Sequence, residues 1–157
     1  MRARGILVLV ASFVLAGAVL AQSKMSSMSH AAKAPIFMPA SDMKWTDLDP
    51  QGAPGVKIVD LWGDHTKGAF GALTKFPAGF SAPLHTHTNA CKIVVISGTF
   101  IQAPEGKPEV RLGAGSYEMQ PGDGYKHTTA CDKASECVFF IEGSGKFDLK
   151  PVEAAKK

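Results

Sequence analysis

Short hydrophobic runs alternate with glycine, proline, aspartate and asparagine, at intervals of roughly ten residues, from Val56 onward. No run keeps a 3.6-residue period, so helices are expected to be minor. Many short strands with glycine turns are typical of a sandwich or barrel, and we predict one all-β domain over residues 56–150. The predicted strands are Val56–Trp62, Ala69–Phe76, Leu84–His87, Cys91–Ser97, Thr99–Gln102, Val110–Leu112, Ser116–Met119, Tyr125–Thr128, Cys137–Glu142 and Lys146–Leu149.

The strand predicted over residues 91–97 is largely apolar on both faces. Alternation puts Cys91, Ile93 and Val95 on one face, and the other carries Val94 and Ile96. Burial of both faces requires a second sheet or a subunit contact. A homodimer is therefore predicted.

The first 21 residues have the pattern of a secretory signal peptide. Arg2 and Arg4 precede an apolar run from Ile6 to Leu20, and Val19-Leu20-Ala21 suits a cleavage site. The run is shorter than the ~20 residues that a bilayer span needs, and a retained N-terminal anchor is the alternative. We predict a periplasmic or secreted protein that is free of the membrane after cleavage.

Three further segments flank the predicted barrel. Residues 22–34 lack apolar periodicity and are predicted to be a disordered linker, in which His30 is solvated. Residues 35–55 are rich in proline, aspartate and glycine with scattered apolar anchors such as Trp45, and are predicted to wrap over a sheet. Residues 151–157 are predicted to be a C-terminal tail.

The charge argues against nucleic acid as a partner. The whole chain carries +3, and removal of the two leader arginines leaves a mature chain near +1 with Arg111 as its sole arginine. Binding of nucleic acid depends on neutralising phosphates with clustered basic side chains. We therefore expect a small-molecule partner and no nucleic acid.

The cysteine count is odd. Cys131 and Cys137 flank a polar segment that reads as a turn, and a bridge between them is worth roughly 2–3 kcal/mol in the chain-entropy model. We predict this disulfide, with two reduced thiols as the alternative. Cys91 is then left over.

Two histidines carry the main chemical signal. His85 and His87 are two residues apart on a predicted strand, so both imidazoles point to the same side and can reach one metal ion. They lie in a segment that resembles the first motif of the cupin superfamily, with Gly79 before them and Gly98 after them. Cys91 occupies the position of that motif's glutamate.

A second segment resembles the second cupin motif. It contains Gly115, the turn Pro121-Gly122-Asp123-Gly124 and His127. The spacing from proline to histidine is one residue longer than usual, and Cys131 stands where asparagine is common. Together the motifs imply a small, single-domain, secreted cupin with a jelly-roll β-barrel.

The resemblance implies a metal site formed by His85, His87 and His127. Neutral imidazoles bind Fe, Zn, Mn, Ni or Cu, and three of them on a rigid barrel leave positions open for water or substrate. We predict one divalent transition metal of unspecified identity. The alternative is that these histidines are surface or hydrogen-bonded core residues.

Cys91 has four interpretations: a buried hydrophobic residue, a fourth metal ligand, a disulfide partner of Cys131, or a reactive thiol. A thiolate ligand would favour Zn, Fe or Cu. Some thiol dioxygenases of the superfamily resemble this chain, with three histidines and a cysteine near the glutamate position. Oxygen chemistry at Fe(II) is therefore compatible with the resemblance.

The remaining candidates are weaker. Tyr125 and Lys126 precede His127 and are predicted to act on substrate or to support the ligands, the alternative being an ordinary strand flank. Asn89 could approach the metal from the loop after His87. His65 lies in a predicted turn and is expected to be exposed.

Glu118 alternates with Tyr117 and Met119 on a predicted strand. If those two residues face the barrel interior, Glu118 points outward and is not a catalytic acid.

The function predicted from these features is that of a metal-dependent enzyme, dioxygenase-like, acting on a small organic molecule. The alternatives are a non-catalytic metal or ligand sensor, often zinc-binding, and a structural metal protein of the cell envelope. No catalytic residue is assigned.

Overall fold

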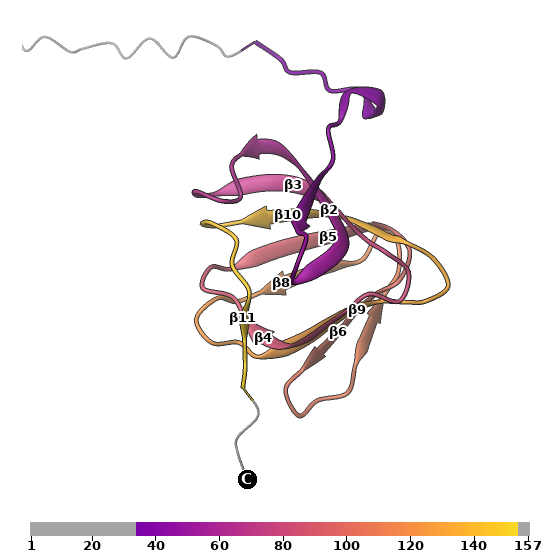
Figure 1. Ribbon diagram of the computed structural model, residues 1–157, viewed down its shortest axis with the longest axis vertical. Helices are drawn as coiled ribbons and strands as arrows, with labels where there is room; N and C mark the ends of the chain where they lie inside the picture. Colours follow the sequence, from indigo (N-terminus) through magenta and orange to yellow (C-terminus); the bar gives the residue numbers. More distant parts are fainter. Residues whose placement is uncertain (1–33, 154–157) are drawn as a thin grey trace, which may run out of the picture. The chain divides into compact units, whose positions relative to one another are not determined.

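Two antiparallel β-sheets face each other across a shared core in this computed structural model, which describes residues 34–153 (Figure 1). The six-stranded sheet has the order β1 (Thr46–Asp49), β2 (Ala53–Gly63), β3 (Phe70–Phe76), β10 (Cys137–Gly143), β5 (Cys91–Ser97), β8 (Tyr117–Gln120). The five-stranded sheet has the order β11 (Lys150–Pro151), β4 (Ser81–Thr86), β9 (His127–Cys131), β6 (Phe100–Pro104), β7 (Val110–Leu112). The predicted all-β jelly-roll barrel is confirmed.

Helical structure is confined to the short 3₁₀ turn η1 (Ala40–Asp42) in the part of the chain that the structure describes. Within residues 34–153 no helix has the length and hydrophobicity that a membrane crossing requires. The predicted signal peptide (1–21), His30 and residues 154–157 lie outside the described residues.

The first and the last strands differ from those predicted from the sequence. Strand β1 lies inside the segment 35–55 that was expected to precede the core strands, and it pairs with β2. It was missed because Leu48 is its one apolar residue. Residues 146–149 do not form a strand, and Lys150 and Pro151 pair instead with Thr86 and His85.

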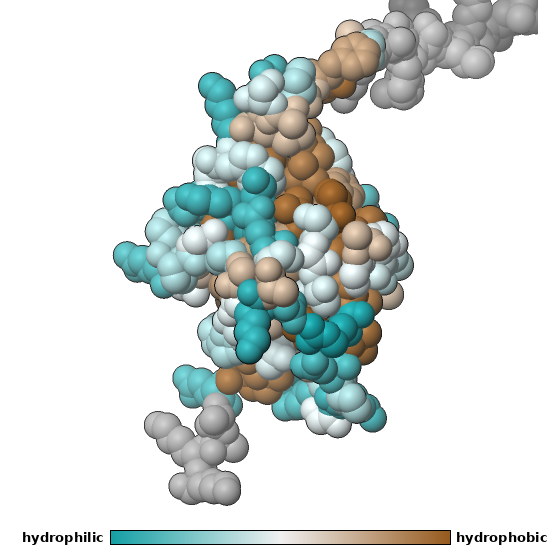
Figure 2. Space-filling model, turned by 90° about the vertical axis from the view of Figure 1, so that its right-hand side faces the viewer, coloured by the Kyte–Doolittle hydropathy of each residue, from teal (hydrophilic) through white to brown (hydrophobic). Residues whose placement is uncertain are grey.

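The core alternates along the strands as the period-two pattern requires. In β5, Cys91, Ile93 and Val95 are buried, whereas Val94 and Ile96 are 40% and 49% exposed. The second face of this strand is therefore uncovered in the single chain, contrary to the expectation that both faces are buried, and the homodimer stays a prediction. Figure 2 shows that hydrophobic residues lie among hydrophilic ones on one side of the molecule.

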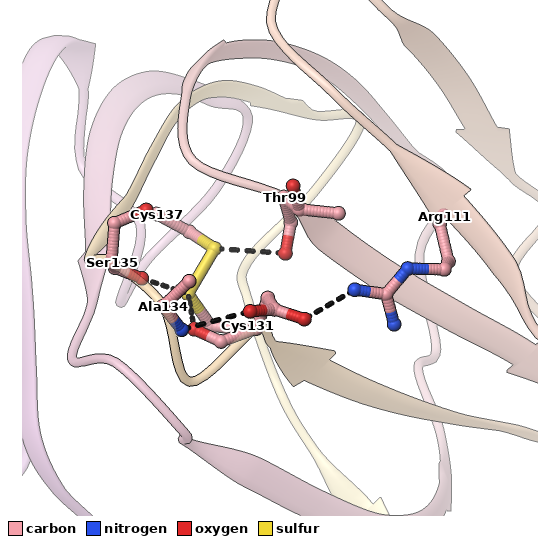
Figure 3. Close-up of a disulfide and its surroundings, with 7 residues drawn as sticks. Thr99, Arg111, Cys131, Ala134, Ser135 and Cys137 are labelled. Atoms are coloured by element: carbon pink, nitrogen blue, oxygen red, sulfur yellow. Dashed lines mark hydrogen bonds and ion pairs between the residues drawn. A yellow bond between two sulfur atoms is a disulfide. The ribbon is translucent and has the colours of Figure 1, made fainter.

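A disulfide joins the two sheets at one end of the barrel. It connects Cys131, the last residue of β9, to Cys137, the first residue of β10 (Figure 3). The carbonyl oxygen of Thr99 lies 3.2 Å from the sulfur of Cys137, as a close contact, because a disulfide sulfur has no hydrogen to donate. His127 stands at the opposite end of β9, so disulfide and histidines occupy opposite ends of the barrel.

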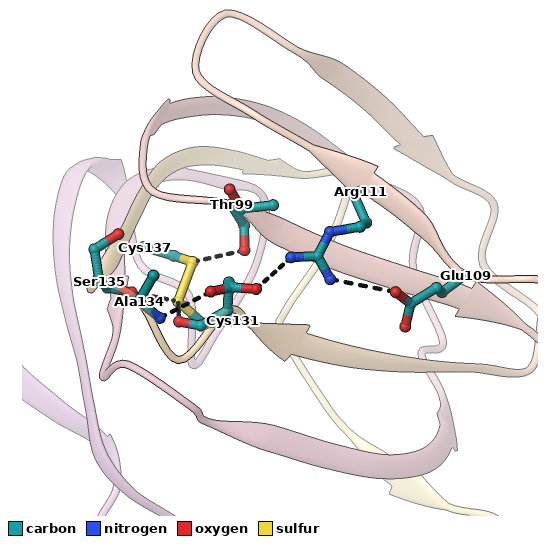
Figure 4. A network of polar contacts seen from close by, with 8 residues as sticks. Thr99, Glu109, Arg111, Cys131, Ala134, Ser135 and Cys137 are labelled. Carbon is teal, nitrogen blue, oxygen red and sulfur yellow. Dashed lines mark hydrogen bonds and ion pairs between the residues drawn. A yellow bond between two sulfur atoms is a disulfide. The ribbon is translucent and has the colours of Figure 1, made fainter.

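An ion-pair network braces the disulfide loop. The Arg111 guanidinium pairs with Asp132 and, at 3.2 Å, with Glu109 (Figure 4). The other carboxylate oxygen of Asp132 accepts a hydrogen bond from the backbone N–H of Ala134 at 2.8 Å. Arg111 is thus engaged in a structural contact.

Two glycines are required by close backbone approach. Gly98 has φ +78°, and a Cβ there would lie 2.3 Å from the carbonyl oxygen of Glu136. A Cβ on Gly122 would lie 2.4 Å from the carbonyl oxygen of Thr88. The second glycine lets the 121–124 turn pack against the loop that follows His87.

Candidate metal centre

Three histidines converge between β4 and β9. His85 and His127 are register partners on these adjacent strands, and His87 follows the last residue of β4. Ring centroids are separated by 4.3 Å (His85–His127), 4.9 Å (His85–His87) and 5.2 Å (His87–His127). One ring nitrogen of each histidine lies within 4.8 Å of the others, and the three side chains are at most 8% exposed.

Backbone carbonyls fix the orientation of all three rings. The Nδ1–H of His85 donates to the carbonyl of Pro83 at 2.6 Å, that of His127 to Tyr125 at 3.2 Å, and that of His87 to Asp148. These bonds occupy Nδ1 and leave Nε2 of each ring free to bind a metal ion. Metal-bound histidines usually donate their other ring N–H to such a carbonyl, which fixes the orientation of the ring.

The Nε2 atom of His127 is buried and has no hydrogen-bond partner among the described residues. A buried polar atom in this state needs an explanation, and a metal ion would supply one. Three neutral nitrogens of this kind fit a divalent transition metal. The donor set therefore suits the predicted cofactor.

Burial keeps the imidazoles neutral. It lowers the pKa of His85 and His87, against the opposing effect of their backbone hydrogen bonds, and lowers the pKa of His127 to about 4 with a further contribution from His85. At neutral pH the rings therefore present lone pairs to a metal without having to lose a proton.

Cys91 lies outside the histidine group. Its side chain is 3% exposed, packs in the apolar core and has its Sγ 3.8 Å from the carbonyl oxygen of Asn89. Burial raises the pKa of this thiol to about 11, so it is protonated at neutral pH. This geometry favours a buried hydrophobic thiol, and the pairing of Cys131 with Cys137 removes the alternative disulfide.

Tyr125 and Lys126 have different surroundings. The ring of Tyr125 stacks on that of His127 at 5.0 Å and 26°, while its carbonyl accepts the Nδ1–H described above. The ammonium of Lys126 pairs with Glu105 at 3.2 Å, and both side chains are substantially exposed. Tyr125 therefore contacts the candidate ligand His127, whereas Lys126 makes a surface contact.

Glu118 faces the barrel interior. Its neighbours Tyr117 and Met119 are 58% and 54% exposed, so the premise that would have turned Glu118 outward does not hold. One carboxylate oxygen accepts a hydrogen bond from Gln120 Nε2 at 3.2 Å, and the other is buried without a partner among the described residues. Burial raises the pKa of this carboxyl group, against the effect of Gln120.

His65 is partly buried, which corrects the expectation that it is exposed. Its side chain is 17% exposed and its Nδ1 lies 2.9 Å and 3.1 Å from the two carboxylate oxygens of Asp60. Sequence spacing gave no signal for this pair. Asn89, the other loop candidate, donates a hydrogen bond to the carbonyl of Lys146 at 3.0 Å.

A cavity of about 510 Å³ opens beside His85 and His87. Its volume is within the range of about 300–1,000 Å³ common for small-molecule sites. Besides histidines, the buried polar residues of its lining are Thr74, Gln120 and Thr129. The phenylalanines in its wall are Phe70, Phe76, Phe80, Phe100, Phe139 and Phe147.

The fold is similar to that of several solved proteins, one of which is described as a cupin. The polyketide cyclase RemF from Streptomyces resistomycificus matches with a TM-score of 0.64 and 16% identity, over 78% of this chain and 89% of that chain. An RmlC-like cupin from Ralstonia eutropha matches with 0.60 and 20%, over 77% and 78%. The DMSP lyase DddQ from Ruegeria pomeroyi matches with 0.58 and 19%, over 74% and 64%.

At these identities the likeness shows the fold alone. No curated protein matches the sequence. A family model described as a domain of unknown function, DUF4437, matches residues 37–157, which cover the whole barrel. The chain therefore belongs to the DUF4437 family, and its fold is that of the cupins.

Proposed function

We propose that this protein is a metal-dependent enzyme that acts on a small organic molecule. One observation carries the proposal: three buried imidazoles, each held through Nδ1, converge with their other ring nitrogens free, and two of them, His85 and His87, line a cavity of about 510 Å³. A cavity bordered by such a cluster is the usual arrangement of a metalloenzyme site. Solved proteins of similar fold include a polyketide cyclase and a DMSP lyase.

His85, His87 and His127 would hold the ion. When bound, a divalent metal would supply a Lewis acid with open positions for a small molecule, and within this class we propose an oxygenase. The apolar residues of the cavity wall would limit the access of water to a bound molecule. Glu118 would hold or release a proton at its unpartnered oxygen, because burial raises the pKa of its carboxyl group.

Metal analysis of protein purified without chelator tests the proposal. We expect about one equivalent of metal in the wild type and its loss in the double variant His85→Ala, His87→Ala. His30→Ala is the matched control, since it removes an imidazole from the segment predicted to be a linker, outside the triad. Full metal occupancy in the double variant would refute the site.

The identity of the metal separates the catalytic and non-catalytic functions. Iron(II) with oxygen consumption in the presence of a thiol, diketone or phenol supports the oxygenase. Tightly held zinc with no exchangeable position would support a sensor or a structural role instead.

We also propose that the chain is exported. The proposal rests on the pattern of residues 1–21, and the disulfide between Cys131 and Cys137 is compatible with an oxidising compartment.

A further inference from the structure

The end of the cavity nearest the disulfide is an aromatic floor formed by Phe76, Phe80, Phe100 and Phe139. Phe76 contacts the other three, with ring centroids 4.5 Å from Phe80, 4.9 Å from Phe139 and 6.0 Å from Phe100. Strand register places Phe76 opposite Cys137 and Phe100 opposite Cys131, which fixes this floor at the disulfide end.

The end of the cavity near the histidines is also aromatic on one side. The ring of Phe147 lies 5.2 Å from that of His87 and meets Phe70 edge-on at 6.4 Å. A flat ring inside the cavity would therefore meet phenyl edges and faces from the floor up to the histidines. Aromatic pairs in such offset or edge-on arrangements add to simple burial.

The lining offers no buried cation to a ligand. Apart from histidines, the ionisable residues that line the cavity, among those the structure describes, are Asp49 and Lys146, and both are exposed. An anionic ligand would lose its hydration without gaining a buried partner charge, which is costly. The interior polar groups Thr74, Gln120 and Thr129 are uncharged hydrogen-bonding groups.

We propose that the cavity takes a neutral molecule with an aromatic or fused-ring body and one hydroxyl or carbonyl oxygen. The ring lies on the aromatic floor, and the oxygen points toward His85 and His87, the polar end of the cavity. The role of that oxygen as the reacting end rests on the proposed function; the preference for a neutral ring does not.

The test is isothermal titration of the full-length, metal-free protein with three probes. 2-Naphthol carries a ring and a hydroxyl group, 1-decanol replaces the ring with a chain, and 2-naphthoate replaces the hydroxyl group with an anion. We expect 2-naphthol to bind at least tenfold more tightly than either of the other probes.

Two variants test whether 2-naphthol binds in the cavity. Phe80→Ala removes one ring of the floor, and Ala53→Phe adds a side chain to the cavity wall; each should weaken 2-naphthol about tenfold. Phe37→Ala is the matched control, because Phe37 is 86% exposed. Circular dichroism tests whether each variant is folded. If a variant is not folded, the comparison of the three probes on the wild type tests the ligand class.

The ligand class would be overturned if 1-decanol or 2-naphthoate bound as tightly as 2-naphthol. It would also be overturned if both cavity variants were folded and bound 2-naphthol as tightly as the wild type. Metal content of the purified protein is measured separately. If the metal-free protein binds 2-naphthol but the purified protein contains no metal, the proposed function is refuted and the ligand class stands. If the purified protein contains metal but does not bind 2-naphthol, the ligand class is refuted and the proposed function stands.

Discussion

His87 and Asp148 are 61 positions apart and are joined by a hydrogen bond from the imidazole Nδ1–H to the Asp148 carbonyl. The carboxylate of the same aspartate accepts two more bonds, from the backbone N–H of Thr88 at 2.8 Å and from its hydroxyl group at 2.5 Å. One residue from the irregular segment before β11 therefore orients a metal-ligand candidate and the residue that follows it.

Replacing Asp148 by alanine should weaken metal binding without unfolding the barrel. The backbone carbonyl remains, but loss of both bonds to Thr88 frees the loop that holds His87, and we expect about a tenfold fall in zinc affinity. Competitive titration with a chelating dye measures the change. Asp47→Ala, at a surface ion pair with Lys57, is the control; equal affinities in the two variants would contradict the positioning role.

Glu118→Gln should stabilise the protein in a pH-dependent way. The folded-state pKa of Glu118 is raised, so its stabilising contribution is complete below the unfolded value near 4.5 and is lost as pH rises through the folded value. A neutral amide avoids the cost of burying the charge. We expect a gain of up to about 1 kcal/mol at pH 8 that disappears near pH 4.

Denaturant unfolding at the two pH values measures this gain. Glu109→Gln serves as the matched control, because the side chain of Glu109 is 56% exposed. A gain that is the same at both pH values would show that ionisation of Glu118 is not its cause.

The disulfide should protect both of its cysteines. We expect Cys131 and Cys137 to resist alkylation in the native protein until a reductant is added, as measured by mass spectrometry. The double variant Cys131→Ser, Cys137→Ser should lose roughly 2–3 kcal/mol of stability, because the unfolded chain is no longer constrained. Free alkylation of both thiols in native periplasmic material would rule the bond out.

Cys91→Ala distinguishes a buried thiol from a metal ligand. Since Sγ lies outside the histidine group, we expect metal affinity to stay within about threefold of wild type, while stability falls by about 1 kcal/mol through lost packing. His127→Ala, measured in parallel, should abolish binding. Comparable losses of metal in both variants would make Cys91 a ligand.

The sequence by itself determined the features that depend on near neighbours. Alternation along a strand puts His85 and His87 on one side whatever the rest of the chain does. The positions of glycine and proline predicted most of the strands. The short polar segment between Cys131 and Cys137 predicted a turn, and with it the disulfide between them. These signals are local, so they survive without knowledge of the partner strands.

Only the tertiary structure decided which face of the strand over residues 117–120 lies inside the barrel and which distant residues contact the histidines. Hydrophobicity alone favours Tyr117 and Met119 as the interior face of this strand, yet both are more than half exposed and Glu118 and Gln120 face inward. Pairing of Glu118 with the buried Ile93 settled the choice. The link from Asp148 to His87 runs through a backbone carbonyl, which any residue type carries, so no sequence pattern could have marked it.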